Sequence, residues 1–195
     1  MDNIFAQPGK PLPHGATIVN DGVNFSVFTR NGTSVILDIF ENPDDETPCF
    51  SYTLDPNINR TGDIWHVFLK GLKAGALYLY RVDGPFNPEK GHRFNKNTYL
   101  LDPYAKSFTD CSVFANLPPD YVTPVDNIDI LTGKPRSAKG FPKCIVVDDD
   151  EFDWQGDRPI NYPLRQSVVY ETHLKGFTAD SSSGVKHPGT YKGLI

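Results

Sequence analysis

The clearest structural signal in the chain is GVNFSVFTRNGTSVILDIF, residues 22–40. Apolar residues occupy every second position of 23–27 and again of 35–39, which is the period of a half-buried β-strand. Between the two runs stands Asn31-Gly32, a pair that tolerates positive φ and predicts a tight turn. The stretch therefore predicts two β-strands with a short connection between them.

Three further strands are predicted downstream, at residues 50–54, 64–69 and 77–82. The second of these is apolar on both faces except for His66. Short strands at this spacing, with no sustained helical period, are typical of an antiparallel sandwich, whereas an up-and-down barrel needs about eight strands or more. We therefore expect an all-β fold: an immunoglobulin-like β-sandwich over residues 15–110, preceded by a tail, residues 1–14.

The character of the sequence changes after the predicted sandwich. Residues 111–163 are punctuated by proline and rich in acidic side chains, which predicts an irregular surface connector. A calcium loop is the sharper interpretation of the acidic run 148–157, but the glycine that an EF-hand turn requires is missing. Residues 167–173 then read as one strand, and Thr190 is a plausible N-cap of a helix that starts as the chain stops. We expect the 195 residues to be the beginning of a longer protein.

Composition excludes several functional classes. The formal net charge is −5 with no basic run, which argues against nucleic-acid binding and suits a neutral partner. No apolar stretch approaches the roughly 20 residues of a membrane span, and residues 1–13 lack the apolar core of a signal peptide. The widely spaced cysteines Cys49, Cys111 and Cys144 predict free thiols in a reducing compartment, and we expect a cytoplasmic protein.

The sequence contains none of the common catalytic or cofactor motifs. There is no HExxH pair, no Gly-x-Ser-x-Gly elbow, no Walker loop and no dinucleotide fingerprint. The 24 acidic residues would allow a carboxylate pair for glycoside hydrolysis to be chosen arbitrarily, because nothing in their spacing selects one. We therefore assign no catalytic residue and expect neither a metal nor a cofactor.

Aromatic residues are the candidates for sugar binding, since a pyranose stacks its apolar C–H face on an exposed ring. The candidates are Trp65, Tyr78, Tyr80 and Trp154. Each has a plainer interpretation: Trp65 lies within a strand and suits a core position, and the two tyrosines suit cross-strand packing. Trp154 suits an anchor that fixes the connector onto a neighbouring domain.

Several segments together resemble the isoamylase and bacterial glycogen-debranching family, and they occur in the family's order. They are 22–28 (GVNFSVF), 65–68 (WHVF), 71–75 (GLKAG), 78–85 (YLYRVDGP), 91–95 (GHRFN), 100–106 (LLDPYAK), 152–154 (FDW), 170–178 (YETHLKGFT) and 189–194 (GTYKGL). The resemblance implies a carbohydrate-binding-module-like sandwich followed by a (β/α)₈ barrel of the α-amylase superfamily. Residues 164–195 would then be the truncated start of that barrel, with 170–173 in its first strand.

The resemblance also implies a function. The parent enzyme would hydrolyse α-1,6-glucosidic branch linkages in glycogen or limit dextrins by a retaining mechanism, and its catalytic carboxylates would lie on later barrel strands. Of the residues present, Lys175 and Phe177 would come near the active-site face of the barrel. The expected partners are α-glucans (glycogen, limit dextrin or maltooligosaccharide) and the rest of the barrel, and the 195 residues alone should be inactive.

Two alternatives stay open on the sequence alone. The chain could be a non-catalytic glucan-binding or bracing module, or the start of a branching or trehalose-releasing enzyme with the same domain plan. Residues 175–178 (KGFT) resemble the debranching group, because branching enzymes typically carry a Gly-Ser-Trp type sequence there.

Overall fold

The structure, a computed structural model, describes residues 4–109 and 137–195 and divides into two compact units, Met1–Phe152 and Asp153–Ile195. Part of the expected connector, with Cys111, lies outside the described residues. Among the described residues, no helix combines the length and the apolar character that crossing a bilayer requires.

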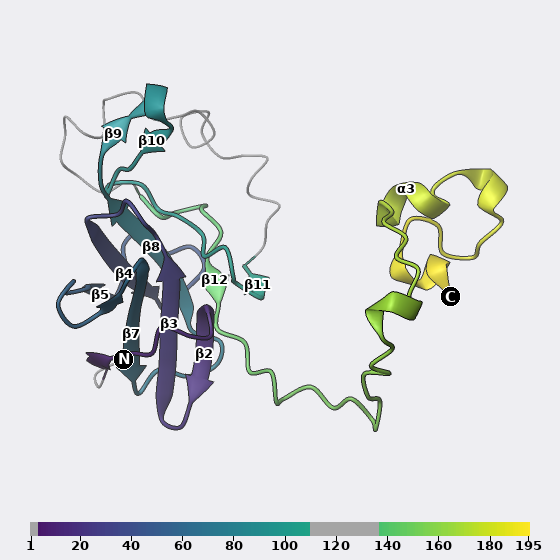
Figure 1. Cartoon of the computed structure of the whole chain (residues 1–195), viewed down its shortest axis with the longest axis horizontal. Coiled ribbons are helices and arrows are strands. Elements are labelled where there is room, and N and C mark those ends of the chain that lie inside the picture. The colour runs from purple at the N-terminus through teal and green to yellow at the C-terminus, as the bar shows by residue number, and fades with distance from the viewer. Residues whose placement is uncertain (1–3, 110–136) are drawn as a thin grey trace. The chain divides into compact units, whose positions relative to one another are not determined.

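The first unit is built of antiparallel strands (Figure 1). They are β1 (Phe5–Pro8), β2 (Gly15–Val19), β3 (Gly22–Phe28), β4 (Ser34–Phe40), β5 (Phe50–Thr53), β6 (Arg60–Thr61), β7 (Ile64–Lys70), β8 (Leu77–Asp83), β9 (Phe86–Asn87), β10 (His92–Arg93), β11 (Ser107–Phe108) and β12 (Cys144–Ile145). One sheet has the order β1-β7-β3-β2 with β6 beside β7, and the other has the order β11-β12-β8-β4-β5. The five strands predicted from the sequence are confirmed as β3, β4, β5, β7 and β8, and so is the β-sandwich.

The core lies between these two sheets. Each inward residue of β3 lies opposite an inward residue of β7: Val23 with Leu69, Phe25 with Val67, and Val27 with Trp65. The two sheets meet at Phe25 of β3 and Tyr78 of β8, whose rings pack edge to face with centroids 5.0 Å apart. Fully burying a large apolar side chain contributes roughly 1.5–3 kcal/mol, so the side chains packed at this interface stabilise the fold.

The turn predicted at Asn31-Gly32 does not form a hairpin. β3 and β4 lie in different sheets, so residues 29–33 cross from one sheet to the other. Neither residue of the pair has positive φ. Gly32 is needed for close packing instead: a Cβ there would stand 2.8 Å from Thr29 Cγ2 and 3.1 Å from Val82 Cγ1.

The N-terminal segment, expected to be a tail, is part of the sandwich. Residues 5–8 form β1 and pair with β7. Residues 9–14 then cross the outer face of β3, where Asn24 exchanges two hydrogen bonds with the backbone of Lys10 at 2.7 and 3.0 Å. Ser26 donates to the carbonyl of Pro11 at 2.6 Å. The polar residues of β3 are therefore buried under this segment instead of facing water.

Part of the expected connector also belongs to the sandwich. β12 pairs with β8 and β11, and Ala138, Cys144 and Val146 are buried in the core. The sheet needs this strand because β8 would otherwise present an unpaired edge there. The domain boundary predicted at residue 110 is thus too early.

The second unit contains short helical turns and no strand among its residues. They are the 3₁₀ turns Leu164–Gln166, Ser181–Ser183 and Tyr191–Leu194, and the helix α3 (Leu174–Thr178). The strand expected at 167–173 is not formed; the side chains of Val168, Val169 and Tyr170 are exposed. A barrel strand needs a neighbouring strand to pair with, and none is present in this unit.

Candidate functional site

Three of the four predicted sugar-binding aromatics lie in the core. Trp65 and Tyr78 are 0% exposed and Tyr80 is 2% exposed, so none of them can present a ring face to a sugar. This corrects the prediction of Trp65, Tyr78 and Tyr80 as binding residues; the alternative of core packing holds for all three. Tyr78 and Tyr80 pack edge to face with ring centroids 6.0 Å apart.

The outer face of the second sheet is covered by other side chains at Phe40. Phe40 points outward from β4, yet it is 0% exposed because Tyr99 packs on it edge to face at 5.8 Å between ring centroids. The ammonium of Lys143 lies 4.9 Å from the centroid of the same ring and donates to the carbonyls of Pro43 and Ala138. Desolvation in this position lowers the pKa of Lys143.

A charged cluster lies on the same outer face and spans three strands. The guanidinium of Arg81 on β8 forms two bonds to the carboxylate of Asp38 on β4, at 2.5 and 2.9 Å. Ser51 on β5 donates to the same carboxylate at 2.5 Å. The bond to Asp38 raises the pKa of Arg81 further above its ordinary value. Because Asp38 is fully buried and accepts bonds from both Arg81 and Ser51, the cluster links the three strands, and its carboxylate is not accessible to a ligand.

Trp154 is the one predicted aromatic that is exposed, with 64% of its surface accessible. It belongs to the second unit, where a tight turn places it: Asp157 N donates to the carbonyl of Trp154 at 2.8 Å, and Gln155 and Gly156 both have positive φ. The ring lines an open hollow of about 600 Å³ together with Asp157, Arg158, Pro159 and Ile160. A flat ring beside a carboxylate and a guanidinium can stack a sugar and bind its hydroxyl groups.

Lys175 and Phe177, expected near a barrel active-site face, lie on helix α3 instead of at a strand end. His173 caps the N-terminus of this helix, and its Nδ1 accepts a hydrogen bond from Gly176 N at 3.1 Å. Lys175 is exposed, and Phe177 packs edge to face on Tyr170 with centroids 6.1 Å apart. No catalytic residue has been assigned in the second unit, so the expected position of Lys175 and Phe177 near an active site stays a prediction.

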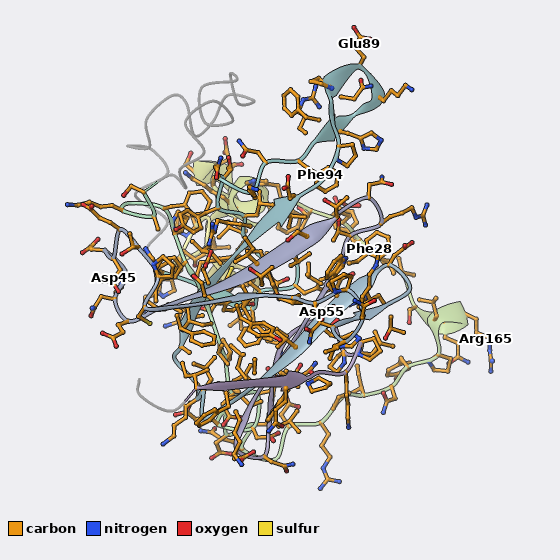
Figure 2. The ribbon with its side chains drawn as sticks, turned by 90° about the vertical axis from the view of Figure 1, so that its left-hand side faces the viewer. Phe28, Asp45, Asp55, Glu89, Phe94 and Arg165 are labelled. Carbon is orange, nitrogen blue, oxygen red and sulfur yellow. The ribbon has the colours of Figure 1, made fainter. Side chains whose placement is uncertain are left out.

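Sequence reasoning missed a further hollow, of about 260 Å³, in the first unit. Strand β8, the β9–β10 hairpin and the segment that follows the hairpin all contribute to it, and its lining residues are Val82, Gly91, Arg93, Phe94, Asn95, Thr98 and Leu100. Figure 2 shows Phe94 at the base of this hairpin and Glu89 at its tip, away from the sheets. Loop residues of this kind carry no periodic pattern, so alternation could not reveal them.

A larger hollow of about 790 Å³ lies where the β2–β3 turn meets the β7–β8 turn. Phe5, Ile18 and Leu72 provide its apolar wall. Its charged groups include the ion pair of Lys70 with Asp21, at 2.9 Å, and that bond lowers the pKa of Asp21. Because Lys70 and Asp21 form an ion pair with each other, the hollow has fewer charged groups left to bind a ligand than its size suggests. Within the described residues, no three His, Cys, Asp or Glu side chains gather as a metal site.

Comparison with known proteins agrees with the fold. Residues 13–105 match the family model of carbohydrate-binding module 48, the isoamylase N-terminal domain. The chain is 40% identical to isoamylase 1, chloroplastic, of Arabidopsis thaliana over 99% of its length, and 39% identical to the glycogen debranching enzyme of Yersinia enterocolitica over 95%. It spans only 23% and 26% of these two proteins.

Solved structures share the fold at lower sequence identity. The Group B Streptococcus pullulanase SAP matches 93% of this chain and 21% of its own, with a TM-score of 0.52 and 22% identity. The catalytic module of the pneumococcal glycogen-degrading factor SpuA matches 96% of this chain and 25% of its own, with a TM-score of 0.54 and 17% identity. The family match within the sandwich, and the relatedness that extends through almost all the remaining residues, lead to one conclusion. The β-sandwich matches the family model of carbohydrate-binding module 48, and the chain as a whole is similar to isoamylases and glycogen debranching enzymes, of which it spans about a quarter.

Proposed function

We propose that this chain is the N-terminal part of a glycoside hydrolase that cleaves α-1,6-glucosidic branch linkages in glycogen or limit dextrins. One observation carries the proposal: identity of 39–40% to an isoamylase and a debranching enzyme over 95–99% of the chain. The alignment therefore extends beyond residues 13–105 into the second unit, and it is not the match of a binding module alone.

The chemistry would be carried out by residues that this chain does not contain. A retaining glycosidase needs a carboxylate nucleophile and a carboxylic acid about 5–5.5 Å apart. Residues 164–195 are proposed as the start of the catalytic barrel, since Val168, Val169 and Tyr170 are exposed apolar side chains that neighbouring strands would cover. The 195-residue chain alone should therefore release no reducing sugar from glycogen or pullulan.

Binding of an α-glucan is the proposed contribution of the chain itself. The family description of the matched module supports it, and a related pullulanase of the same fold has been solved in complex with maltotetraose. Of the aromatic candidates, Trp154 is the one whose ring and hollow suit a glucan chain. We propose Trp154 as a stacking residue, assisted by Asp157 and Arg158.

A second candidate role, bracing of the catalytic barrel without sugar affinity, is favoured by a different observation. Tyr99 and Lys143 cover the outer face of one sheet, and residues 9–14 cover the middle of the other. A module whose sheets are covered at these positions has less free surface for a ligand, which suits a supporting role. Native electrophoresis of the chain through gels with and without glycogen separates the two roles: glucan binding retards the chain in the glycogen gel, and pure bracing leaves its mobility unchanged.

The enzymatic part of the proposal is tested on the full-length gene product. It should release linear maltooligosaccharides from glycogen limit dextrin, whereas the 195-residue chain should release none. Activity of the short chain that survives repurification would contradict the absence of catalytic residues.

A further inference from the structure

The Asn31-Gly32 pair, which the sequence predicts as a turn, has a chemical reactivity that depends on the fold. Of the asparagines in the sequence, Asn31 is the one that precedes a glycine. A backbone nitrogen that follows asparagine can attack the side-chain amide, and glycine allows this most readily because it has no side chain to block the approach. Asparagine is for this reason among the thermolabile residues. Asn31 is exposed, so water has access to the reacting amide.

The backbone nitrogen that would have to react is engaged in a hydrogen bond. Gly32 N donates to Oγ1 of Thr29 at 3.2 Å, and Gly32 itself is buried. The attack needs this nitrogen without its proton and turned toward Cγ of Asn31, whereas the bond fixes both the proton and the direction of the N–H. The hydroxyl of Thr29 therefore opposes the reaction in the folded chain.

The loop around the pair is also held at both ends. The N–H groups of Thr29 and Thr33 donate to carbonyls just before β7 and at the end of β8, at 2.9 and 2.8 Å. The carbonyl of Asn31 lies close to Gly84, where an added Cβ would stand 2.8 Å from it. Since rotation of the peptide group that follows Asn31 would disturb these contacts, the geometry needed for attack requires the loop to open.

We propose that Asn31 is a latent deamidation site, which the Thr29 hydroxyl keeps unreactive while the sandwich is folded. When the loop opens, Gly32 N gives up its proton and bonds to Cγ of Asn31, and the side-chain nitrogen takes up a proton and leaves as ammonia. Water then opens the resulting succinimide at either of its two carbonyl carbons, which gives aspartate or isoaspartate at position 31. The chemistry needs water alone as co-reactant and does not depend on the proposed α-glucan function.

Isoaspartate would not fit the loop. It runs the main chain through the side-chain carbon, so the connection between β3 and β4 becomes one atom longer. Gly32 fills a slot in which a Cβ would already stand 2.8 Å from Thr29 Cγ2 and 3.1 Å from Val82 Cγ1, which leaves no room for a displaced backbone. A chain modified while unfolded should therefore refold to a less stable sandwich, and modification should accumulate with the time that this crossover spends open.

The test is incubation of the 195-residue chain at mildly alkaline pH, in buffer and in concentrated urea, followed by mass spectrometry that locates the modified residue. Deamidation raises the mass of the peptide that contains residue 31, whereas isomerisation of Asp21 or Asp83, which also precede glycine, leaves the mass unchanged. We expect conversion of Asn31 to be more than about tenfold faster in urea than in buffer, because the open loop is a minor population of the folded chain.

Two substitutions of Thr29 separate the effect of the hydroxyl from that of the side-chain shape. Thr29→Val removes the hydroxyl and keeps the branched shape, and in buffer it should speed conversion about fivefold, the effect of losing one hydrogen bond. Thr29→Ser keeps the hydroxyl and should stay within about twofold of the wild-type rate. Ile39→Val makes a small cavity at the other end of β4 from this loop, so it controls for a general loss of stability and should also stay near the wild-type rate.

Other results would overturn the proposal. Equal rates in buffer and in urea would show that the fold gives no protection, and no conversion in urea would remove Asn31 as a site. Equal rates for Thr29→Val and Thr29→Ser, or a rate for Ile39→Val as high as that for Thr29→Val, would show that the hydroxyl is not the protecting group. A chain that carries isoaspartate and refolds with the wild-type free energy of unfolding would contradict the expected clash in the loop.

Discussion

The phenol of Tyr78 donates a hydrogen bond of 2.8 Å to Oδ2 of Asp102 inside the sandwich. The other carboxylate oxygen of Asp102 accepts from Tyr104 N at 2.8 Å, and its own backbone N–H points at Cys144 Sγ at 3.3 Å. Strand β8, residues 102–104 and strand β12 are thus joined at one buried carboxylate. This network explains why residues 100–106, which follow the predicted strands, are part of the domain.

Removing the phenol should destabilise the sandwich. Tyr78→Phe leaves the buried carboxylate of Asp102 with one donor fewer, and we expect the free energy of unfolding to fall by about 1–3 kcal/mol. Urea unfolding followed by circular dichroism measures the change. The matched control is Tyr80→Phe, two residues along the same strand, because the Tyr80 hydroxyl is buried without a partner among the described residues. Its removal should leave stability unchanged or raise it, and equal losses in the two variants would contradict the network.

The Asp102 carboxyl should make stability depend on pH. Desolvation raises the pKa of Asp102 above its ordinary value, against the opposing effects of the bonds from Tyr104 and Tyr78. The folded state therefore binds this proton more tightly than the unfolded state, and stability falls as pH rises from about 3.8 through the raised pKa. In Asp102→Asn the side chain stays neutral, and Nδ2 can donate to the Tyr78 hydroxyl while Oδ1 keeps its bond. We expect a smaller loss of unfolding free energy between pH 4 and pH 7 than in the wild type; an identical pH profile would contradict the assignment.

The Arg81–Asp38 pair should matter more than the ion pairs on the surface. Arg81→Lys keeps the charge but replaces a two-point fork with a single ammonium, so about 1–3 kcal/mol of unfolding free energy should be lost. Lys139→Met breaks the pair with Glu46 at 3.3 Å, in which both side chains are more than 60% exposed. That control should change stability by no more than about 0.5 kcal/mol. If Arg81→Lys lowers the unfolding free energy no more than Lys139→Met does, the two-point bond of Arg81 to Asp38 contributes little to stability.

Limited proteolysis should define the true end of the first domain. The sandwich includes Ala138, Cys144 and Val146, whereas the side chains of 168–170 are exposed. We expect the first cuts among residues 158–173 and a resistant product that retains residues 144–146, identified by mass spectrometry. A resistant product ending near residue 110 would contradict the pairing of β12 with β8.

Trp154 provides the direct test of the proposed glucan contact in the second unit. Trp154→Ala removes a ring worth about 0.5–1.5 kcal/mol as a stacking partner, so retardation in a glycogen gel should weaken roughly 2- to 10-fold. Tyr191→Ala is the matched control, because Tyr191 is a similarly exposed aromatic of the same unit that does not line the Trp154 hollow. Equal retardation of both variants would remove Trp154 from the binding site.

The sequence predicts strands in which apolar and polar residues alternate. It does not predict which side chains are buried by residues that are distant in the sequence. β3 reads as half-buried because Asn24 and Ser26 are polar, yet no local pattern shows that residues 9–14 cover them. The pair of Arg81 with Asp38 joins residues 43 positions apart, which strand periodicity cannot reveal. β12 is only two residues long, too short for any period to appear.

The sequence also could not show which candidate binding residues are buried, because that too depends on contacts between distant segments. Strand β8 reads LYLYRVD, with apolar side chains at all of its first four positions, so alternation cannot tell which face holds the tyrosines. The register with β4 decides it: Tyr78 and Tyr80 lie opposite Ile39 and Leu37, which face the core. Asn95 and Thr98 lie in a loop, and the sequence does not show that Asn95 Nδ2 and Thr98 Oγ1 are buried without a hydrogen-bond partner among the described residues. That property exists only in three dimensions.

The most direct test of the proposed activity is proton NMR of the anomeric region while the full-length gene product acts on glycogen. The α-1,6 signal should decline, no new branch signal should appear, and linear maltooligosaccharides should accumulate. The 195-residue chain, run in parallel, should leave the spectrum unchanged. A rising α-1,6 signal would identify a branching enzyme, and release of trehalose with constant branch content would identify a trehalose-releasing hydrolase; either result would contradict the proposed debranching activity.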